Sequence, residues 1–219
     1  MRKIPIVVTA YCDGEGSEIK IRMAEKLCQE LNKTGHYVCL ATHSTLPQSI
    51  QKLCNAYIYD SDNDFHIDGL PVEGRNHGIA EIKSVHNALN YLERFGFKEF
   101  FKVSYDIDPT LPFNTIIERA QFIVDNYNKE FVGSGWGDNR TLAALTYYST
   151  FDFFRKITPL ETPEKYKSCF EVSWFLSAEE KGVLDKVYIS HIRLYDDFLG
   201  FVIRDYSHQA GTEIDYYPH

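Results

Sequence analysis

Near its N-terminus the chain reads Ile4-Pro5-Ile6-Val7-Val8-Thr9-Ala10-Tyr11, a nearly continuous apolar run rich in β-branched residues. Such a run is typical of a strand that is buried on both faces of a parallel sheet. From Ser17 to Leu31 apolar residues recur at every fourth position, which predicts a helix that closes before Gly35. A buried strand followed by an amphipathic helix is the unit from which doubly wound α/β sheets are built.

The same alternation continues to residue 133. Strands are predicted at 36–42, 56–59, 100–104 and 130–133, and helices at 46–53, from after 80 to 95, and at 112–127. Residues 65–80 contain glycines and a proline without any period, which predicts a long loop of the kind that often carries function. We therefore expect an α/β fold with a doubly wound, mostly parallel nucleotide-binding-type sheet flanked by helices.

Beyond residue 133 the pattern is less regular. Strands are predicted at 141–147 and 187–191, helical segments at 149–157, 169–177 and 178–185, and a turn at 136–139. No linker composition separates the two parts, so residues 1–219 are expected to form one domain. We expect residues 1–133 to form a nucleotide-type α/β half and residues 134–219 to form a smaller, irregular half.

Composition excludes several classes of protein. The chain has 219 residues, with 23 Lys and Arg against 31 Asp and Glu, which gives a net charge of −8. This charge argues against a protein that binds the phosphate backbone of nucleic acids. No apolar run is long enough for a transmembrane segment and no signal-peptide core follows the N-terminus, so we expect a cytoplasmic protein. Five cysteines without C-x-x-C spacing indicate neither a disulfide framework nor a zinc site.

Asp106 and Asp108 directly follow the predicted strand at 100–104. Open α/β sheets place their ligands at the carboxyl ends of strands, and two carboxylates spaced in this way suit Mg²⁺ or Mn²⁺. In an acidic chain, such a cation would sit between the protein and a phosphorylated ligand. The alternative is a solvated turn in which an Asp caps the backbone before Pro109.

This order of elements resembles the GT-A fold glycosyltransferases over residues 1–135. The resemblance is carried by Ile4-Pro5-Ile6-Val7-Val8-Thr9-Ala10-Tyr11, Ala41-Thr42-His43-Ser44, Tyr57-Ile58-Tyr59-Asp60, Lys83 and Asn87, and Tyr105-Asp106-Ile107-Asp108. It implies transfer of a hexose from a nucleoside diphosphate sugar, with a UDP-sugar expected first, to a hydroxyl of a carbohydrate or other acceptor. It also implies a Mn²⁺ or Mg²⁺ cofactor.

By position, the resemblance implies that Thr9, Ala10 and Tyr11 contact the base and ribose, and that Asp60 contacts the base edge. The donor is also expected to contact Tyr105, Asp106 and Ile107. Asp106 and Asp108 would hold the metal, with His191 as a third ligand and His208 as the alternative ligand. Further substrate contacts are expected from Arg75, His77 and Lys83 before or within the third long helix, and from Trp136 and Trp174 in the second half.

An inverting transferase also needs a base that deprotonates the acceptor hydroxyl. We expect Glu171, in the apolar segment Cys169-Phe170-Glu171-Val172-Ser173-Trp174-Phe175, to be that base; the alternative is a carboxylate satisfied by a helix start. The His-x-x-Gly-x-x-Lys motif of some retaining families is absent from the sequence, which favours inversion.

Two other functions fit parts of the sequence. Asp106-Ile107-Asp108-Pro109-Thr110-Leu111 is similar to the nucleophile motif of haloacid dehalogenase-type phosphatases, with Leu194-Tyr195-Asp196-Asp197 as a distal acidic motif. In those enzymes this strand normally comes first, whereas here a hundred residues precede it. The second half is short and leaves little surface for an acceptor, so the chain could instead be a module that binds a sugar nucleotide without catalysis.

Overall fold

The computed structural model describes residues 2–14, 16–61, 77–109, 111–134, 142, 146–160, 170–189, 195–196, 201–205 and 214–215. Its main sheet has seven strands in the order β3-β2-β1-β4-β7-β6-β8. Their bounds are Pro5–Ala10 (β1), Tyr37–Thr42 (β2), Ala56–Tyr59 (β3), Glu99–Ser104 (β4), Phe131–Gly133 (β6), Thr146–Thr150 (β7) and Val187–Ile189 (β8).

The sheet is mostly parallel, as the sequence predicted. β1 runs parallel to β2 and β4, β2 to β3, and β6 to β8, whereas β7 is antiparallel to both β4 and β6. From β1 the chain builds outward to β3 and then returns to the other side of β1 as β4. The switch point of this doubly wound sheet, where such folds bind their ligands, therefore lies between β1 and β4.

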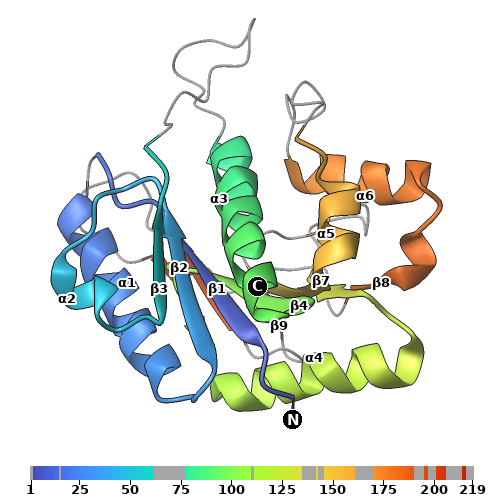
Figure 1. The fold of residues 1–219 in the computed structure, drawn as a ribbon, viewed down its shortest axis with the longest axis horizontal. Helices are drawn as coiled ribbons and strands as arrows, with labels where there is room; N and C mark the ends of the chain where they lie inside the picture. Colours follow the sequence, from blue (N-terminus) through green and yellow to red (C-terminus); the bar gives the residue numbers. More distant parts are fainter. Residues whose placement is uncertain are drawn as a thin grey trace, which may run out of the picture.

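Helices cover both faces of the sheet (Figure 1). Their bounds are Ser17–Asn32 (α1), Gln48–Gln51 (α2), His77–Leu92 (α3), Phe113–Tyr127 (α4), Phe151–Ile157 (α5) and Phe170–Glu180 (α6), with short 3₁₀ turns at Glu93–Phe95 (η1) and Leu184–Lys186 (η3). α1, α2 and α4 pack on the face formed by Ile6, Val8 and Phe101. α3, α5 and α6 pack on the opposite face, which includes Phe100 and Tyr147.

A second, smaller sheet joins the segment after β4 to the last part of the chain. It has the order β11-β10-β5, with β9 also paired to β10, and its strands are Ile107–Pro109 (β5), Tyr195–Asp196 (β9), Phe201–Asp205 (β10) and Ile214–Asp215 (β11). β10 is antiparallel to β5, and its Val202 pairs with Asp108. The sequence analysis did not predict this sheet, because strands of two to five residues carry too little periodicity to be recognised.

Several element boundaries differ from the prediction. α3 begins at His77, inside the predicted loop at 65–80, because Ile79 and Ile82 are buried and extend the apolar stripe of the helix upstream. The strand predicted at 141–147 is described as β7 at 146–150. The helix after it starts two residues later than predicted because Thr150 caps it: the Thr150 side chain accepts a hydrogen bond of 3.2 Å from the Phe153 N–H.

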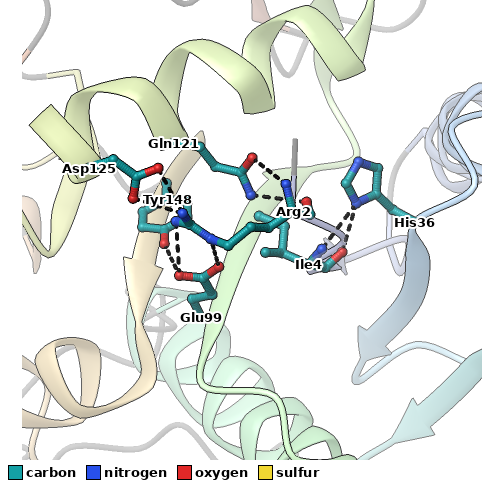
Figure 2. A network of polar contacts seen from close by, with 7 residues as sticks. All are labelled: Arg2, Ile4, His36, Glu99, Gln121, Asp125 and Tyr148. Atoms are coloured by element: carbon teal, nitrogen blue, oxygen red, sulfur yellow. Dashed lines mark hydrogen bonds and ion pairs between the residues drawn. The ribbon is translucent and has the colours of Figure 1, made fainter.

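A polar cluster fixes the amino end of β1 against its neighbours (Figure 2). The Arg2 guanidinium lies 2.8 Å from Glu99 Oε1 and 2.7 Å from both Asp125 carboxylate oxygens. The Arg2 N–H donates to Gln121 Oε1, and Gln121 Nε2 donates back to the Arg2 carbonyl. Tyr148 donates to Glu99 from the neighbouring strand. The cluster thus ties β1, β4, β7 and α4 together at the edge opposite the switch point.

His36 lies beside this cluster at the start of β2 (Figure 2). Its ring is buried, and its Nδ1 atom lies 2.9 Å from the Ile4 carbonyl oxygen. Burial is the largest influence on the ring and lowers the pKa of His36 below its ordinary value, because a charged imidazolium is poorly solvated there. The folded protein therefore favours the neutral form of His36.

This lowered pKa makes the stability of the protein depend on pH. Between the ordinary histidine pKa of about 6.5 and the lower folded value, the unfolded chain binds the proton more readily, so stability falls as the pH falls. We expect urea unfolding to give a free energy that decreases from pH 7 to pH 5, and His36→Gln to make that decrease shallower. An unchanged pH slope in the variant would show that other groups cause the decrease.

Candidate functional site at the carboxyl edge of the sheet

The ends of four strands bring residues that were predicted to contact the substrate to one edge of the sheet. Thr9 pairs with Ser104, Ala10 with Thr42, and Thr42 with Tyr59. The hydrogen bonds continue past the strand ends, because the Tyr105 N–H donates to the Thr9 carbonyl at 3.1 Å and the Asp60 N–H donates to the Thr42 carbonyl at 3.0 Å. Tyr11, His43, Asp60 and Asp106 consequently follow neighbouring strands at the same edge.

His43 connects this edge to α3. Its side chain is buried, with Nδ1 at 3.1 Å from the Asp60 carbonyl oxygen and Nε2 at 2.8 Å from both the Ala80 carbonyl oxygen and Ser84 Oγ. Asn87, one turn further along α3, donates to Asp60 Oδ2 at 2.9 Å. The Asp60 carboxylate is therefore oriented by the helix rather than left to rotate at the end of β3.

A buried ion pair lies between β4 and α3, and the sequence analysis missed it. Lys102 is fully buried, and its Nζ contacts Glu81 Oε1 and lies 2.5 Å from Ser104 Oγ. Thr9 Oγ1 donates to the same Glu81 oxygen at 3.2 Å. A lysine within the otherwise apolar segment 100–103 was the signal, since a charge at an interior strand position requires a buried partner.

Tyr11 lies just past β1 and is half-buried. Lys20, in the first turns of α1, has its ammonium 5.5 Å from the centre of the Tyr11 ring and donates to the Asp13 carbonyl at 3.1 Å. The Lys20 ammonium and the Tyr11 ring thus lie together at the end of the first strand. Lys20 was not among the residues predicted for the site.

The two aspartates of the D-x-D segment take different positions. Asp106 is half-buried in the turn after β4, and Asp108 lies within β5, where only its main chain is described. Ile107 between them is buried against the core that contains α4. Among the side chains that the structure describes, no three or more His, Cys, Asp or Glu residues gather as metal ligands.

The other predicted site residues divide into three groups. Thr9 and Ala10 are buried, while Lys83 and Tyr105 are half-buried near the edge. His77 and Glu171 lie in the first turns of α3 and α6, and their side chains are outside the described set. Arg75, Trp136 and His191 lie outside the described residues.

Trp174 packs in the core instead of lining the edge. It is fully buried, and its ring meets Tyr147 and Phe154 edge-on, with both pairs of ring centres 5.6 Å apart. Such T-shaped contacts between buried rings stabilise the packing of α5 and α6 on the sheet. In this structure the ring therefore offers no face on which a sugar could stack.

Comparison with known proteins identifies the fold. No family model and no curated protein matches the sequence. The structure is similar to a cytidylyltransferase from Leptospira borgpetersenii serovar Hardjo-bovis, with a TM-score of 0.51, 13% identity, and coverage of 90% of this chain and 79% of that chain. It is also similar to a glycosyltransferase involved in the glycosylation of the major capsid of PBCV-1, with a TM-score of 0.50, 10% identity, and coverage of 95% and 96%.

These likenesses confirm the predicted fold class, a mixed α/β sheet of the nucleotide-binding type. Within the described part of the chain, no helix combines the length and the apolar character needed to cross a membrane.

The His43 contacts generate a prediction about how α3 is held. We expect His43→Leu to lower the free energy of unfolding by about 1–3 kcal/mol, because it removes hydrogen bonds to buried carbonyl groups. Ser84→Ala is the matched control, since it removes one partner of the ring and is expected to cost about 1 kcal/mol or less. Urea unfolding of both variants measures the difference, and an equal loss in both would contradict a bridging role for the ring.

Proposed function

We propose that this chain is a metal-dependent glycosyltransferase that moves a hexose from a nucleoside diphosphate sugar, a UDP-sugar first among the donors, to an acceptor hydroxyl. The observation that carries the proposal is the position of Asp106 and Asp108. They follow β4 beside β1, at the switch point of the sheet, with Tyr11 and Asp60 on neighbouring strand ends.

The proposed ligands are of the kind that a hard divalent cation prefers. Asp106 and Asp108 offer carboxylate oxygens, which Mg²⁺ and Mn²⁺ prefer, and His191 is the proposed third ligand. When bound, the cation neutralises the charge that develops on a departing diphosphate. The chain carries a net charge of −8, and in so acidic a chain we expect a cation between the protein and the diphosphate.

The remaining residues divide into donor and acceptor roles. Tyr11 and Asp60 would hold the base and ribose, and Arg75, His77 and Lys83 would meet the phosphates or the sugar. Glu171 would accept the proton of the acceptor hydroxyl as its oxygen bonds to the anomeric carbon and the bond from that carbon to the diphosphate breaks. Attack from the face opposite the leaving group inverts the anomeric centre. Trp136 would contribute a contact on the acceptor side.

A second candidate function shares the same fold. The similarity to a cytidylyltransferase raises nucleotidyl transfer as an alternative, in which an acceptor attacks the α-phosphorus of a nucleoside triphosphate and pyrophosphate leaves. The D-x-D segment would hold a cation in that reaction as well, so the products must distinguish the two. Phosphatase chemistry at Asp106 is less favoured, because β4 follows three earlier strands of the sheet.

The proposal predicts a particular product. Incubation with a panel of UDP- and GDP-sugars and Mn²⁺ should release UDP or GDP, and a chelator should abolish the release. Pyrophosphate formed from nucleoside triphosphates and sugar phosphates would instead establish nucleotidyl transfer. Inorganic phosphate released from small phosphomonoesters, with sugar nucleotides left intact, would establish a phosphatase. Nucleotide binding without any turnover would indicate a binding module.

A pair of variants separates the metal ligand from the base. Asp108→Asn should weaken Mn²⁺-dependent UDP binding together with turnover, because the cation bridges the protein and the diphosphate. Glu171→Gln keeps the shape of the side chain but removes the base, so UDP binding should persist while kcat falls by roughly 10²–10⁴-fold. Calorimetric titration and steady-state kinetics measure both quantities.

Each variant also has a result that contradicts its assignment. A Glu171→Gln protein that transfers sugar at the wild-type rate would make Glu171 structural. An Asp108→Asn protein whose UDP binding keeps its dependence on Mn²⁺ would remove Asp108 from the metal site.

A further inference from the structure

Glu81 has one carboxylate oxygen fully engaged with the protein. Its Oε1 receives Lys102 Nζ, Thr9 Oγ1 at 3.2 Å and Ser104 Oγ at 3.4 Å. No hydrogen bond to Oε2 is formed within the part of the chain that the structure describes. The carboxylate is thus fixed in orientation through one oxygen while the other can accept hydrogen bonds.

The members of this network differ in burial. The side chain of Lys102 is 0% exposed and that of Glu81 is 19% exposed, whereas Thr9 and Ser104 are 7% and 5% exposed as residues. Within this network the accessible surface therefore lies on Glu81. The ion pair occupies Oε1 and leaves Oε2, the outer oxygen, outside the pair.

The position of Glu81 places that surface at the switch point. Thr9 and Ser104 pair with each other across β1 and β4, and both hydroxyls lie within hydrogen-bond distance of Glu81. Ala10 follows Thr9 directly, and Asp106 is two residues after Ser104. A ligand that contacts the ends of β1 and β4 therefore passes beside Glu81.

The chemistry of an ionised carboxylate selects what it contacts. It only accepts hydrogen bonds, so it attracts hydroxyl groups and repels the phosphates of a nucleotide. The contact with Lys102 holds the Glu81 carboxylate in one orientation, which favours a strong hydrogen bond from a hydroxyl donor. Nucleoside diphosphate sugars offer such hydroxyls on the ribose and on the hexose.

We infer that Glu81, held by Lys102, binds a hydroxyl group of the sugar-nucleotide donor through its outer oxygen. This inference rests on the proposed function, because it takes the donor to be a sugar nucleotide. Lys102 acts as a positioning residue, since it reaches the ligand only through Glu81.

The test replaces both charges together. Removing one member of a buried ion pair leaves an uncompensated charge, whereas replacing both with neutral side chains of similar size is often tolerated. Glu81→Gln combined with Lys102→Met should therefore fold with a melting temperature near that of the wild type. Its Kd for the sugar nucleotide should rise roughly ten- to a hundredfold, as expected when a hydrogen bond to a charged group is lost.

A matched control removes an ion pair elsewhere. Arg155 Nη2 lies 3.0 Å from Glu93 Oε2, where α5 meets the end of α3, and both side chains are partly exposed. Glu93→Gln combined with Arg155→Met makes the same change in charge at a distance from the switch point. This control should bind the sugar nucleotide as the wild type does.

Two pairs of ligands distinguish the two hydroxyl sources. Calorimetry with UDP and UDP-glucose, and with GDP and GDP-mannose, measures binding in the presence of Mn²⁺. A similar loss of affinity for the diphosphate and for its sugar derivative assigns the contact to the ribose. A loss confined to the sugar derivative assigns it to the hexose. Both results support the inference.

The inference is overturned if the folded double variant binds all of these ligands with wild-type affinity. Glu81→Asp provides a second test that keeps the charge and shortens the side chain, so the pair with Lys102 can persist while the outer oxygen recedes. Wild-type affinity in Glu81→Asp overturns the inference even if the double variant does not fold. If the wild-type protein itself binds none of the nucleotides, the proposed function fails, and the inference falls with it.

Discussion

The ion pair between Lys102 and Glu81 constrains the whole arrangement around the switch point. An ammonium group in the middle of a sheet loses its hydration, and this loss is offset only if an anion and further hydrogen bonds reach it. Glu81 can do so only because α3 lies on the same face of the sheet as Lys102. Once α3 is held there, Ser84 and Asn87 follow on the same helix and meet His43 and Asp60.

The two sheets extend this constraint to the D-x-D segment. β4 holds Lys102 within the main sheet, and three residues after its end the chain begins to pair with β10 in the small sheet. Residues from the last part of the sequence therefore lie beside Asp108, although nearly a hundred residues separate Asp108 from Val202. The irregular second half is thus tied to the edge where the donor is proposed to bind, and it also contributes β7 and β8 to the main sheet.

The sequence predicted the elements whose pattern is local and long. The predicted bounds of β1, α1 and α4 differ from the observed bounds by one residue or a few, because the apolar residues of these elements follow a regular pattern. The small sheet could not be predicted, because its strands are short and its pairings join distant residues. For the site, the positions of Tyr11, Asp60 and Asp106 at strand ends could be inferred from the predicted sheet. The contact between Glu81 and Lys102 could not be inferred, because it depends on how α3 packs on the sheet.

The charges at this edge explain why a cation is central to the proposed chemistry. The edge carries the carboxylates of Asp60 and Asp106. The buried Lys102 forms an ion pair with Glu81, so its charge is already paired within the protein. A diphosphate approaching these carboxylates would be repelled at short range, and the low dielectric of a partly buried site would strengthen that repulsion. The carboxylates of Asp106 and Asp108 would hold a divalent cation, whose positive charge would offset this repulsion. In the proposed function, the same carboxylates that would repel a bare nucleotide would make its binding depend on the metal, and Glu81 and Asp60 would select for uncharged hydroxyl and base groups.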